Sequence, residues 1–280
     1  MPSAMPLTAT LCALGAIALW ATLASLGLAL AHLPPFLLTG LALLIGSAPA
    51  WPLCRQWRVP APTLALGVFG LFGFHFLLFI ALRHAPPVEA NLVNYLWPLL
   101  IVLLAPALLP SARWRPVHVG AALVGFAGAG LAIVGGRDVS QAGFAWGYVA
   151  AFGSALIWAT YSLLTRRVPH FPTAAIGLFG LVSGVLALVC HAALEPAATL
   201  AARDWGLIVV TGLGPLGAAF FLWDAALKRG DPSAIGILSY LTPLASTLLL
   251  VLTSDRPLTP WIVGAATLIV GAAVVGIRAR

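Results

Sequence analysis

A series of apolar windows, each long enough to cross a bilayer, constrains this chain more than any other feature. A transmembrane helix needs about 20 mostly apolar residues, and the charged and proline-rich breaks divide the sequence into about ten such windows. The links between the windows are too short to hold a soluble domain. The sequence therefore predicts an all-α membrane protein whose windows run approximately over 8–31, 34–53, 62–82, 87–109, 116–135, 143–166, 171–193, 203–227, 231–252 and 258–278.

The composition excludes several classes of protein. Hydrophobic residues make up 61% of the 280 residues, charged residues make up 8%, and the mean hydropathy is +1.05, which no ordinary soluble domain shows. The net charge is +7, but the basic residues are scattered over short loops and form no patch for nucleic acid. Cys12, Cys54 and Cys190 lie in separate segments without metal-ligand spacing. We therefore expect no nucleic-acid partner, no metal and no cofactor.

The distribution of Lys and Arg predicts the orientation of the chain. If both termini face the same side, ten of the 14 basic residues lie on that side and four lie on the other. Loops rich in Lys and Arg stay in the cytoplasm, so we expect an even number of spans with both termini cytoplasmic. The cytoplasmic set is Arg55, Arg58, Arg113, Arg115, Arg166, Arg167, Lys228, Arg229, Arg278 and Arg280, and the other set is Arg83, Arg137, Arg203 and Arg256.

The two halves of the sequence resemble each other. An Ala-Leu-Arg or Ala-Leu-Lys triplet, a proline and a Tyr-Leu-x-Pro-Leu run recur at one constant offset of 145 residues. The matched segments are 81–83, 87 and 95–99 in the first half, and 226–228, 232 and 240–244 in the second. Trp-Ala-Thr also recurs, at 20–22 and at 158–160. A chance match between apolar sequences is the alternative, but it does not explain two prolines and a tyrosine at one offset.

This internal repeat predicts the architecture. Each copy holds five helices, so the second copy must enter the membrane from the opposite side to the first. We expect ten transmembrane helices arranged as two inverted repeats, residues 1–137 and 138–280, as in many secondary transporters. These form one integral membrane domain, and the lipid bilayer is its obligatory surroundings.

Two proline-bearing helices, the fourth and the ninth, carry candidate substrate-binding residues. A proline lacks an N–H group and leaves the carbonyl four residues earlier free, which Pro98 does to Asn94 and Pro243 does to Ser239. Residues spaced i, i+3, i+4 and i+7 share a helix face. The fourth helix has Asn91, Asn94, Tyr95 and Pro98 on one face, and the ninth has Gly236, Ser239, Tyr240 and Pro243. Amides facing lipid are costly, so these faces should look inward, toward a solute or toward hydrogen bonds between helices.

Ionisable and aromatic side chains mark further candidates near the bilayer centre. His75 lies in the middle of the third window, with Phe79 on the same face and Phe220 at the equivalent position of the second half. Trp158 and Tyr161 lie in the middle of the sixth window, too deep for anchors at the headgroups. We expect His75 to be a neutral partner of the solute rather than an obligatory proton carrier, because desolvation disfavours its charged form. Simple packing is the alternative for this histidine.

The sequence gives little support for an enzyme. It has no HExxH motif, no GxSxG elbow and no paired carboxylates at depth. Glu89 lies in a first helical turn, and Asp224 precedes Lys228 by one turn, so both acids have structural explanations.

The chain resembles the EamA type of the drug/metabolite transporter superfamily, on the two five-helix halves with a proline-bearing fourth helix in each. The run Glu-Ala-Asn-Leu-Val-Asn-Tyr-Leu-Trp-Pro at 89–98 is similar to the motif of bacterial aromatic amino-acid exporters. The resemblance implies a bacterial inner-membrane protein whose central cavity is lined by helices 1, 3, 4, 6, 8 and 9, with helices 2, 5, 7 and 10 outside. It also implies that the cavity wall includes His75, Tyr95, Trp97, Pro98 and Trp158.

We therefore expect a monomeric secondary transporter that exports aromatic and other neutral amino acids through a central cavity by alternating access. Stacking faces and neutral hydrogen-bond partners suit a zwitterion with an apolar side chain. Export of lipophilic cations is the alternative within transporters, since aromatic side chains also bind cations. A membrane scaffold without transport is the alternative outside them. The coupling of export to protons or to exchange does not follow from the sequence.

Overall fold

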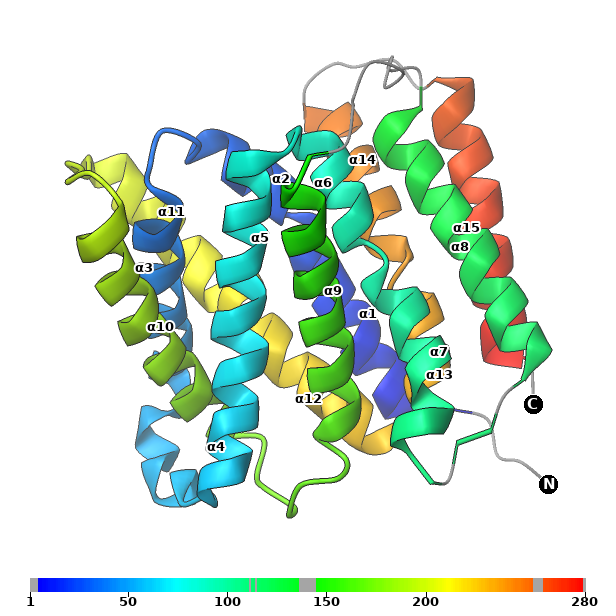
Figure 1. The fold of residues 1–280 in the computed structure, drawn as a ribbon, viewed down its shortest axis with the longest axis horizontal. Coiled ribbons are helices and arrows are strands. Elements are labelled where there is room, and N and C mark those ends of the chain that lie inside the picture. Colours follow the sequence, from blue (N-terminus) through cyan, green and yellow to red (C-terminus); the bar gives the residue numbers. More distant parts are fainter. Residues whose placement is uncertain (1–4, 111, 114, 136–144, 254–258, 279–280) are drawn as a thin grey trace.

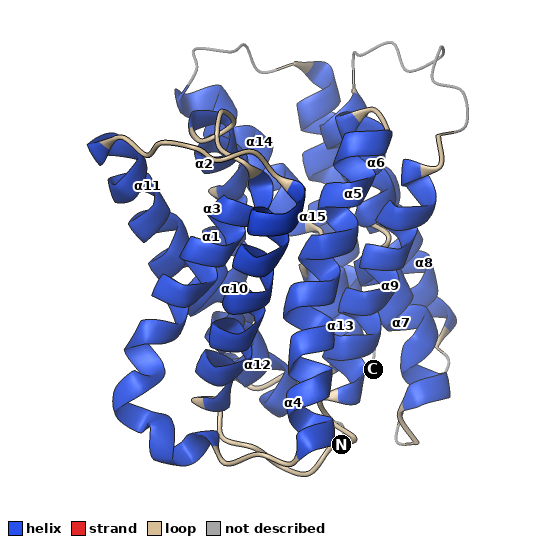
Figure 2. Ribbon diagram, turned by 60° about the vertical axis from the view of Figure 1, so that its left-hand side comes forward, coloured by secondary structure: helices blue, strands red, loops and turns tan. Residues whose placement is uncertain are grey.

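The computed structural model describes residues 5–110, 112, 113, 115–135, 145–253 and 259–278. Within these ranges every regular element is a helix (Figure 2). Nine helical stretches are long and apolar enough to cross a membrane, and Pro260–Gly276 is a shorter apolar helix. The prediction of an all-α membrane protein is confirmed at this level. The predicted boundary between residues 137 and 138 lies outside the described residues.

Several of the spans are interrupted helices. In the first half the elements are α1 (Leu7–Ala21), α2 (Leu23–Ala29), α3 (Pro35–Ser47), η1 (Ala48–Trp57), α4 (Ala61–Val68), η2 (Phe69–Gly73), α5 (Phe74–His84), α6 (Pro87–Asn94), α7 (Trp97–Leu108) and α8 (Pro116–Val134). In the second half they are α9 (Gly147–Leu164), α10 (Ala175–Leu194), α11 (Ala202–Leu213), η3 (Gly214–Ala218), α12 (Ala219–Arg229), α13 (Pro232–Leu238), α14 (Leu241–Thr253) and α15 (Pro260–Arg278).

The helices run between two opposite ends of the molecule, several of them obliquely, and the described chain begins and finishes at the same end (Figure 1). We call this end, with the links near residues 58, 112, 168 and 230, the terminal end, and the opposite end the distal end. Four pairs of helices pack along much of their length: α8 with α15, α3 with α10, α5 with α9, and α1 with α12. All four pairs join the two halves of the sequence, so the halves form one body.

The interruptions recur in both halves. A π-helical turn occupies 69–73 in the third span and 214–218 in the eighth, at the same offset of 145 as the sequence matches. Helical turns are also broken at 95–96 in the fourth span and at 239–240 in the ninth, just before Pro98 and Pro243. These breaks agree with the kinks that the two prolines predict.

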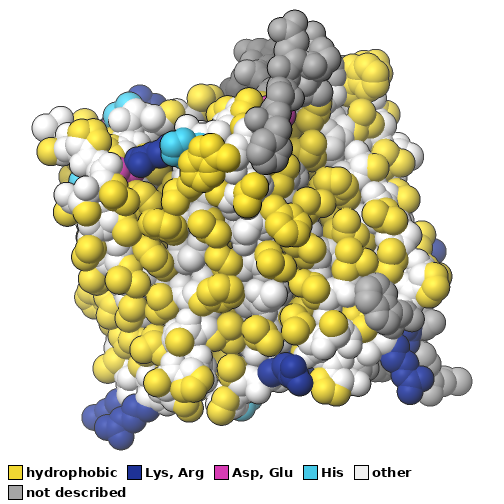
Figure 3. All heavy atoms as spheres, viewed as in Figure 1, with side chains coloured by type: hydrophobic (Ala, Val, Ile, Leu, Met, Phe, Trp, Pro, Cys, Tyr) yellow, Lys and Arg dark blue, Asp and Glu magenta, His cyan; other side chains and the backbone are white. Residues whose placement is uncertain are grey.

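The outer surface is apolar between two polar ends. Large hydrophobic side chains such as Leu123, Val149 and Val263 are exposed. Hydrophobic side chains cover the middle of the face shown in Figure 3. On that face Lys and Arg gather mainly along the terminal edge, with a smaller group at the distal edge. Arg137, Arg256 and Arg280 of the predicted topology lie outside the described residues.

Each polar end holds a buried carboxylate with several partners. At the distal end Glu195 accepts hydrogen bonds from the amides of Phe36 and Leu37 and pairs with Arg83 at 2.8 Å. At the terminal end Asp224 pairs with Lys228 at 2.6 Å and accepts a hydrogen bond from the Thr173 hydroxyl. The predicted pair of Asp224 and Lys228 is therefore present, and it ties α12 to the link before α10.

Candidate functional site

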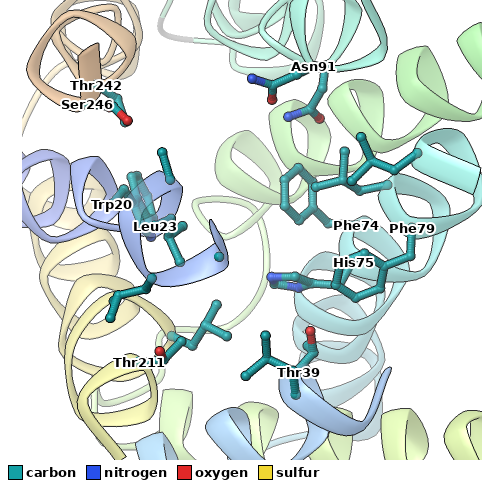
Figure 4. A pocket seen from close by; sticks show the side chains of 18 of the residues that line it. Trp20, Leu23, Thr39, Phe74, His75, Phe79, Asn91, Thr211, Thr242 and Ser246 are labelled. Carbon is teal, nitrogen blue, oxygen red and sulfur yellow. The ribbon is translucent and has the colours of Figure 1, made fainter. Parts of the chain in front are cut away.

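A central cavity of about 630 Å³ opens among the helices in the distal half of the molecule. Helices α2, α5, α6 and α14 form its upper walls, and Thr39 of α3 and Thr211 of α11 lie along one side (Figure 4). Residues of α1, α7, α9, η3 and α12 form its floor. Below the floor the terminal half is closed by packed side chains. The residues that line the cavity are Trp20, Leu23, Ala24, Leu26, Gly27, Leu30, Leu38, Thr39, Phe74, His75, Leu78, Phe79, Leu82, Pro87, Asn91, Asn94, Tyr95, Trp97, Trp158, Thr211, Leu216, Phe220, Thr242 and Ser246.

The floor of the cavity is a cluster of aromatic rings. Trp20 lies at its centre, with ring centroids 5.7 Å from Trp158 and 6.4 Å from Trp97. Trp223 packs beneath the floor, 5.2 Å from Trp20. Phe220 adds a ring 5.7 Å from Trp158. Most of these pairs are tilted or edge-to-face, the arrangements that aromatic quadrupoles favour. A planar aromatic group of a solute can therefore stack on the edges or faces of the rings in the floor.

Backbone carbonyls of the two π-helical turns hold two of these side chains in place. The indole N–H of Trp20 donates to the Pro215 carbonyl at 3.1 Å, and Nδ1 of His75 lies 2.6 Å from the Leu71 carbonyl. A π turn redirects carbonyls away from the regular helical ladder, which makes them acceptors for side chains. A carbonyl only accepts, so Nδ1 of His75 carries the proton, and Nε2 of the neutral ring is an acceptor.

The ring of His75 points from α5 into the cavity, where it meets aromatic neighbours (Figure 4). Its centroid lies 6.1 Å from Phe79 and 6.2 Å from Phe220, the residue at the equivalent position of the second half. The two halves therefore meet across the cavity at this point.

Polar groups of the upper walls are neutral. Asn94 is buried, and its Oδ1 accepts a hydrogen bond of 2.7 Å from the Ser154 hydroxyl. Asn91 lies one turn closer to the distal end, and Thr242 and Ser246 lie opposite, on α14 (Figure 4). The cavity wall contains no Asp, Glu, Lys or Arg among the described residues. This arrangement suits a solute without net charge that has an aromatic or apolar group and polar ends.

The model of the EamA-like transporter family matches residues 7–134 and 145–277. The chain belongs to the EamA-like transporter family. A protein of Ancylobacter novellus named aromatic amino acid exporter YddG is 43% identical over 98% of both chains. The Escherichia coli protein of the same name is 25% identical over 90% of both chains. A crystal structure at 42% identity superposes with a TM-score of 0.88 and covers 96% of both chains. These names describe a transporter, not an enzyme.

The cavity of this EamA-family chain brings together eight of the thirteen residues proposed from the sequence. The other five do not line it. Pro98 is buried in α7, and Tyr161 lies behind Trp158 with ring centroids 5.3 Å apart. The Ser239 hydroxyl donates a hydrogen bond to the Ile235 carbonyl. Tyr240 is fully buried against α8, and Pro243 lines a neighbouring hollow. The eight that line the cavity are His75, Phe79, Asn91, Asn94, Tyr95, Trp97, Trp158 and Phe220.

The structure adds wall residues that the sequence reasoning did not include. Trp20 is the foremost, and its match with Trp158 in the Trp-Ala-Thr repeat was the signal that pointed to it. Thr39 and Leu38 come from the second span, which the family resemblance places outside the cavity. That expectation is wrong for the first turns of α3. Phe36 of α3 packs against Phe79 at 5.5 Å, and this contact brings the second span to the wall.

Proposed function

We propose that the chain exports aromatic and other neutral amino acids across the bacterial inner membrane, and that the solute binds in the central cavity. The observation that carries this proposal is a wall with an aromatic floor, neutral hydrogen-bonding groups and no acidic or basic side chain among the described residues. A zwitterion has no net charge, so it needs no buried counter-ion, whereas an isolated charge in such a wall would be costly. The relatives named aromatic amino acid exporters support the same solute class.

The proposed architecture is ten spans in two inverted five-helix repeats, residues 1–137 and 138–280, with both termini in the cytoplasm. The recurrence of π turns and of helix breaks in the two halves supports this proposal. The two separate matches to the family model, 7–134 and 145–277, also support it. The proposed oligomeric state is a monomer, because the cavity is built from one chain.

The proposed mechanism is alternating access. The cavity reaches the distal end, while the terminal end below the aromatic floor is closed by packing of residues such as Trp223, Leu227 and Ile235. With cytoplasmic termini, this state faces away from the cytoplasm. Release of the solute to the outside would occur here, and loading would follow from separation of the packed residues at the terminal end.

Counterflow in proteoliposomes tests the proposal. Vesicles loaded with unlabelled phenylalanine should accumulate labelled phenylalanine, and tryptophan and leucine inside the vesicles should support the same exchange. Vesicles with tetraphenylphosphonium inside should not drive it, and empty vesicles provide the background. If only the cation drives exchange, lipophilic cations rather than amino acids are the transported class. If nothing drives exchange, a scaffold without transport is favoured.

A further inference from the structure

A second hollow lies beside the central cavity, between α6, α8, α14 and the first turn of α15. Its volume is about 450 Å³. We call it the side chamber. It shares Ala24, Pro87, Asn91, Tyr95 and Ser246 with the central cavity, so the same residues face both hollows. The side chamber therefore adjoins the central cavity along these five residues.

The boundary and the far wall of the side chamber differ in chemistry. The shared boundary carries the Asn91 amide and the Tyr95 and Ser246 hydroxyls. The far wall is formed mainly by apolar side chains, among them Leu131, Ile133, Val251 and Ile262. Polar groups at an entrance and apolar groups beyond it suit an apolar substituent whose polar linkage stays at the boundary.

The dimensions also favour a solute larger than one amino acid. Pockets for drug-sized ligands measure about 300–1,000 Å³. The central cavity lies within this range by itself, and together with the side chamber it slightly exceeds the upper limit. A solute with one aromatic group on the floor near Trp20 can therefore place a second apolar group in the side chamber.

We propose that the side chamber is a second compartment of the solute site and that it binds the second apolar group of zwitterions with two such groups, such as dipeptides of aromatic or branched residues. This inference rests on the proposed function, because it extends the solute class of the same cavity. The peptide amide of a dipeptide would lie at the boundary, within the polar groups of Asn91, Tyr95 and Ser246. The first side chain would occupy the aromatic floor.

Binding of two matched dipeptides to purified protein in nanodiscs tests this inference. Phenylalanylphenylalanine and phenylalanylglycine have the same backbone and termini and differ only in the second side chain. Wild-type protein should bind the first at least about tenfold more tightly, the scale of a whole apolar group placed in a fitting pocket. Equal affinities of the two dipeptides for wild-type protein would overturn the inference, as expected if a lipid chain fills the side chamber.

Variants that fill the side chamber sharpen the test. Ala132→Phe on α8 and Thr247→Leu on α14 add bulk from two walls, and neither residue lines the central cavity. Each should bring the affinity ratio of the two dipeptides close to one and leave the affinity for phenylalanine unchanged. Ala127→Phe is the matched control, because Ala127 is an exposed residue of the same helix that lines neither hollow, and it should keep the wild-type ratio.

The outcomes separate the two proposals. A ratio that persists in every correctly folded filling variant, checked by size-exclusion chromatography, overturns the side-chamber inference. If wild-type protein shows no phenylalanine counterflow, the proposed function is contradicted instead. The ratio of the affinities for the two dipeptides still tests the side chamber in that case. The two variants come from different helices, so a folding defect in one leaves the other as a test.

Discussion

Two side chains in the cavity, His75 and Trp20, are held by hydrogen bonds that they donate to backbone carbonyls. His75 is held by the Leu71 carbonyl and Trp20 by the Pro215 carbonyl, both within π turns. The held groups are donors, so the free acceptor of His75, Nε2, is the part of the ring available to a solute. Substitutions of His75 should therefore distinguish the effect of the ring's hydrogen bond from the effect of its size and shape.

His75→Gln should keep measurable phenylalanine counterflow, within about fivefold of wild type, and His75→Leu should lose most of it. Glutamine retains a polar acceptor at this position, whereas leucine leaves the solute's donor without a partner, at a cost of about 1–3 kcal/mol. Initial rates in proteoliposomes with equal amounts of protein provide the measurement. Equal rates for the two variants would show that hydrogen bonding by residue 75 is not used.

Tyr95→Ala and Trp158→Ala should differ in stability although both reduce counterflow. Tyr95 is half-buried at the cavity wall, so its removal should leave the yield of folded protein nearly normal. Trp158 is 3% exposed and packs against Trp20, Phe74 and other rings, so its truncation should cost about 3–5 kcal/mol. Thermal unfolding in detergent, with wild type alongside, measures the difference. Equal melting temperatures for the two variants would contradict the packing role of Trp158.

At the scale of elements, close packing next to the π turns relies on missing side chains. Gly70 lies within η2, and a Cβ atom added there would come 2.3 Å from Cγ of Tyr161. The Tyr161 ring itself supports Trp158 on the floor, with centroids 5.3 Å apart. The bend of the third span is thus linked to the position of the aromatic floor through one glycine.

Gly70→Ala should destabilise the protein by about 1–3 kcal/mol, because the Tyr161 ring or the helix must move. It should also lower phenylalanine counterflow, because a displaced Tyr161 no longer supports Trp158. Gly120→Ala provides the control, since an added Cβ there has no neighbour within 4 Å. Melting temperatures in detergent and counterflow rates measure both effects. A Gly70→Ala protein as stable and active as Gly120→Ala would exclude this packing role.

At the scale of the whole molecule, the ends of repeat-related helices lie at opposite ends of the bundle. Helix α5 ends at His84 at the distal end, and α12 ends at Arg229 at the terminal end, 145 positions later (Figure 1). An inverted repeat requires this relation, because equivalent segments cross the membrane in opposite directions. For the proposed inverted architecture, the positive-inside rule predicts that the terminal end faces the cytoplasm.

Single cysteines at His84 and Arg229 should therefore react with impermeant maleimides from opposite sides of the membrane. Both residues are exposed, and His84→Cys should label in intact cells, whereas Arg229→Cys should label only after the cells are opened. The native cysteines are replaced in this background, except in a control that keeps only the exposed Cys54 at the terminal end. Labelling of both introduced cysteines from one side would refute the inverted architecture.

Many residues of the cavity wall could be predicted from the sequence, because two sequence signals, proline and helical periodicity, act locally. A proline removes one hydrogen bond wherever it stands in a helix, so the breaks before Pro98 and Pro243 could be predicted. An i, i+3, i+4 face likewise placed Asn91, Asn94 and Tyr95 on the wall. The same reasoning predicted that the equivalent face of the ninth helix lines the cavity. There Tyr240, the equivalent of Tyr95, lies buried against α8 instead.

The sequence by itself determined the class of protein, the approximate positions of its apolar helices and the similarity of its halves, because hydropathy and proline act over one helix at a time. Only the tertiary structure decided which faces surround empty space and which are packed. That choice depends on contacts between distant segments, such as Phe36 against Phe79 and Trp20 against the Pro215 carbonyl. In lipid an apolar side chain has little preference between a neighbouring helix and the bilayer, so the sequence pattern does not encode the choice.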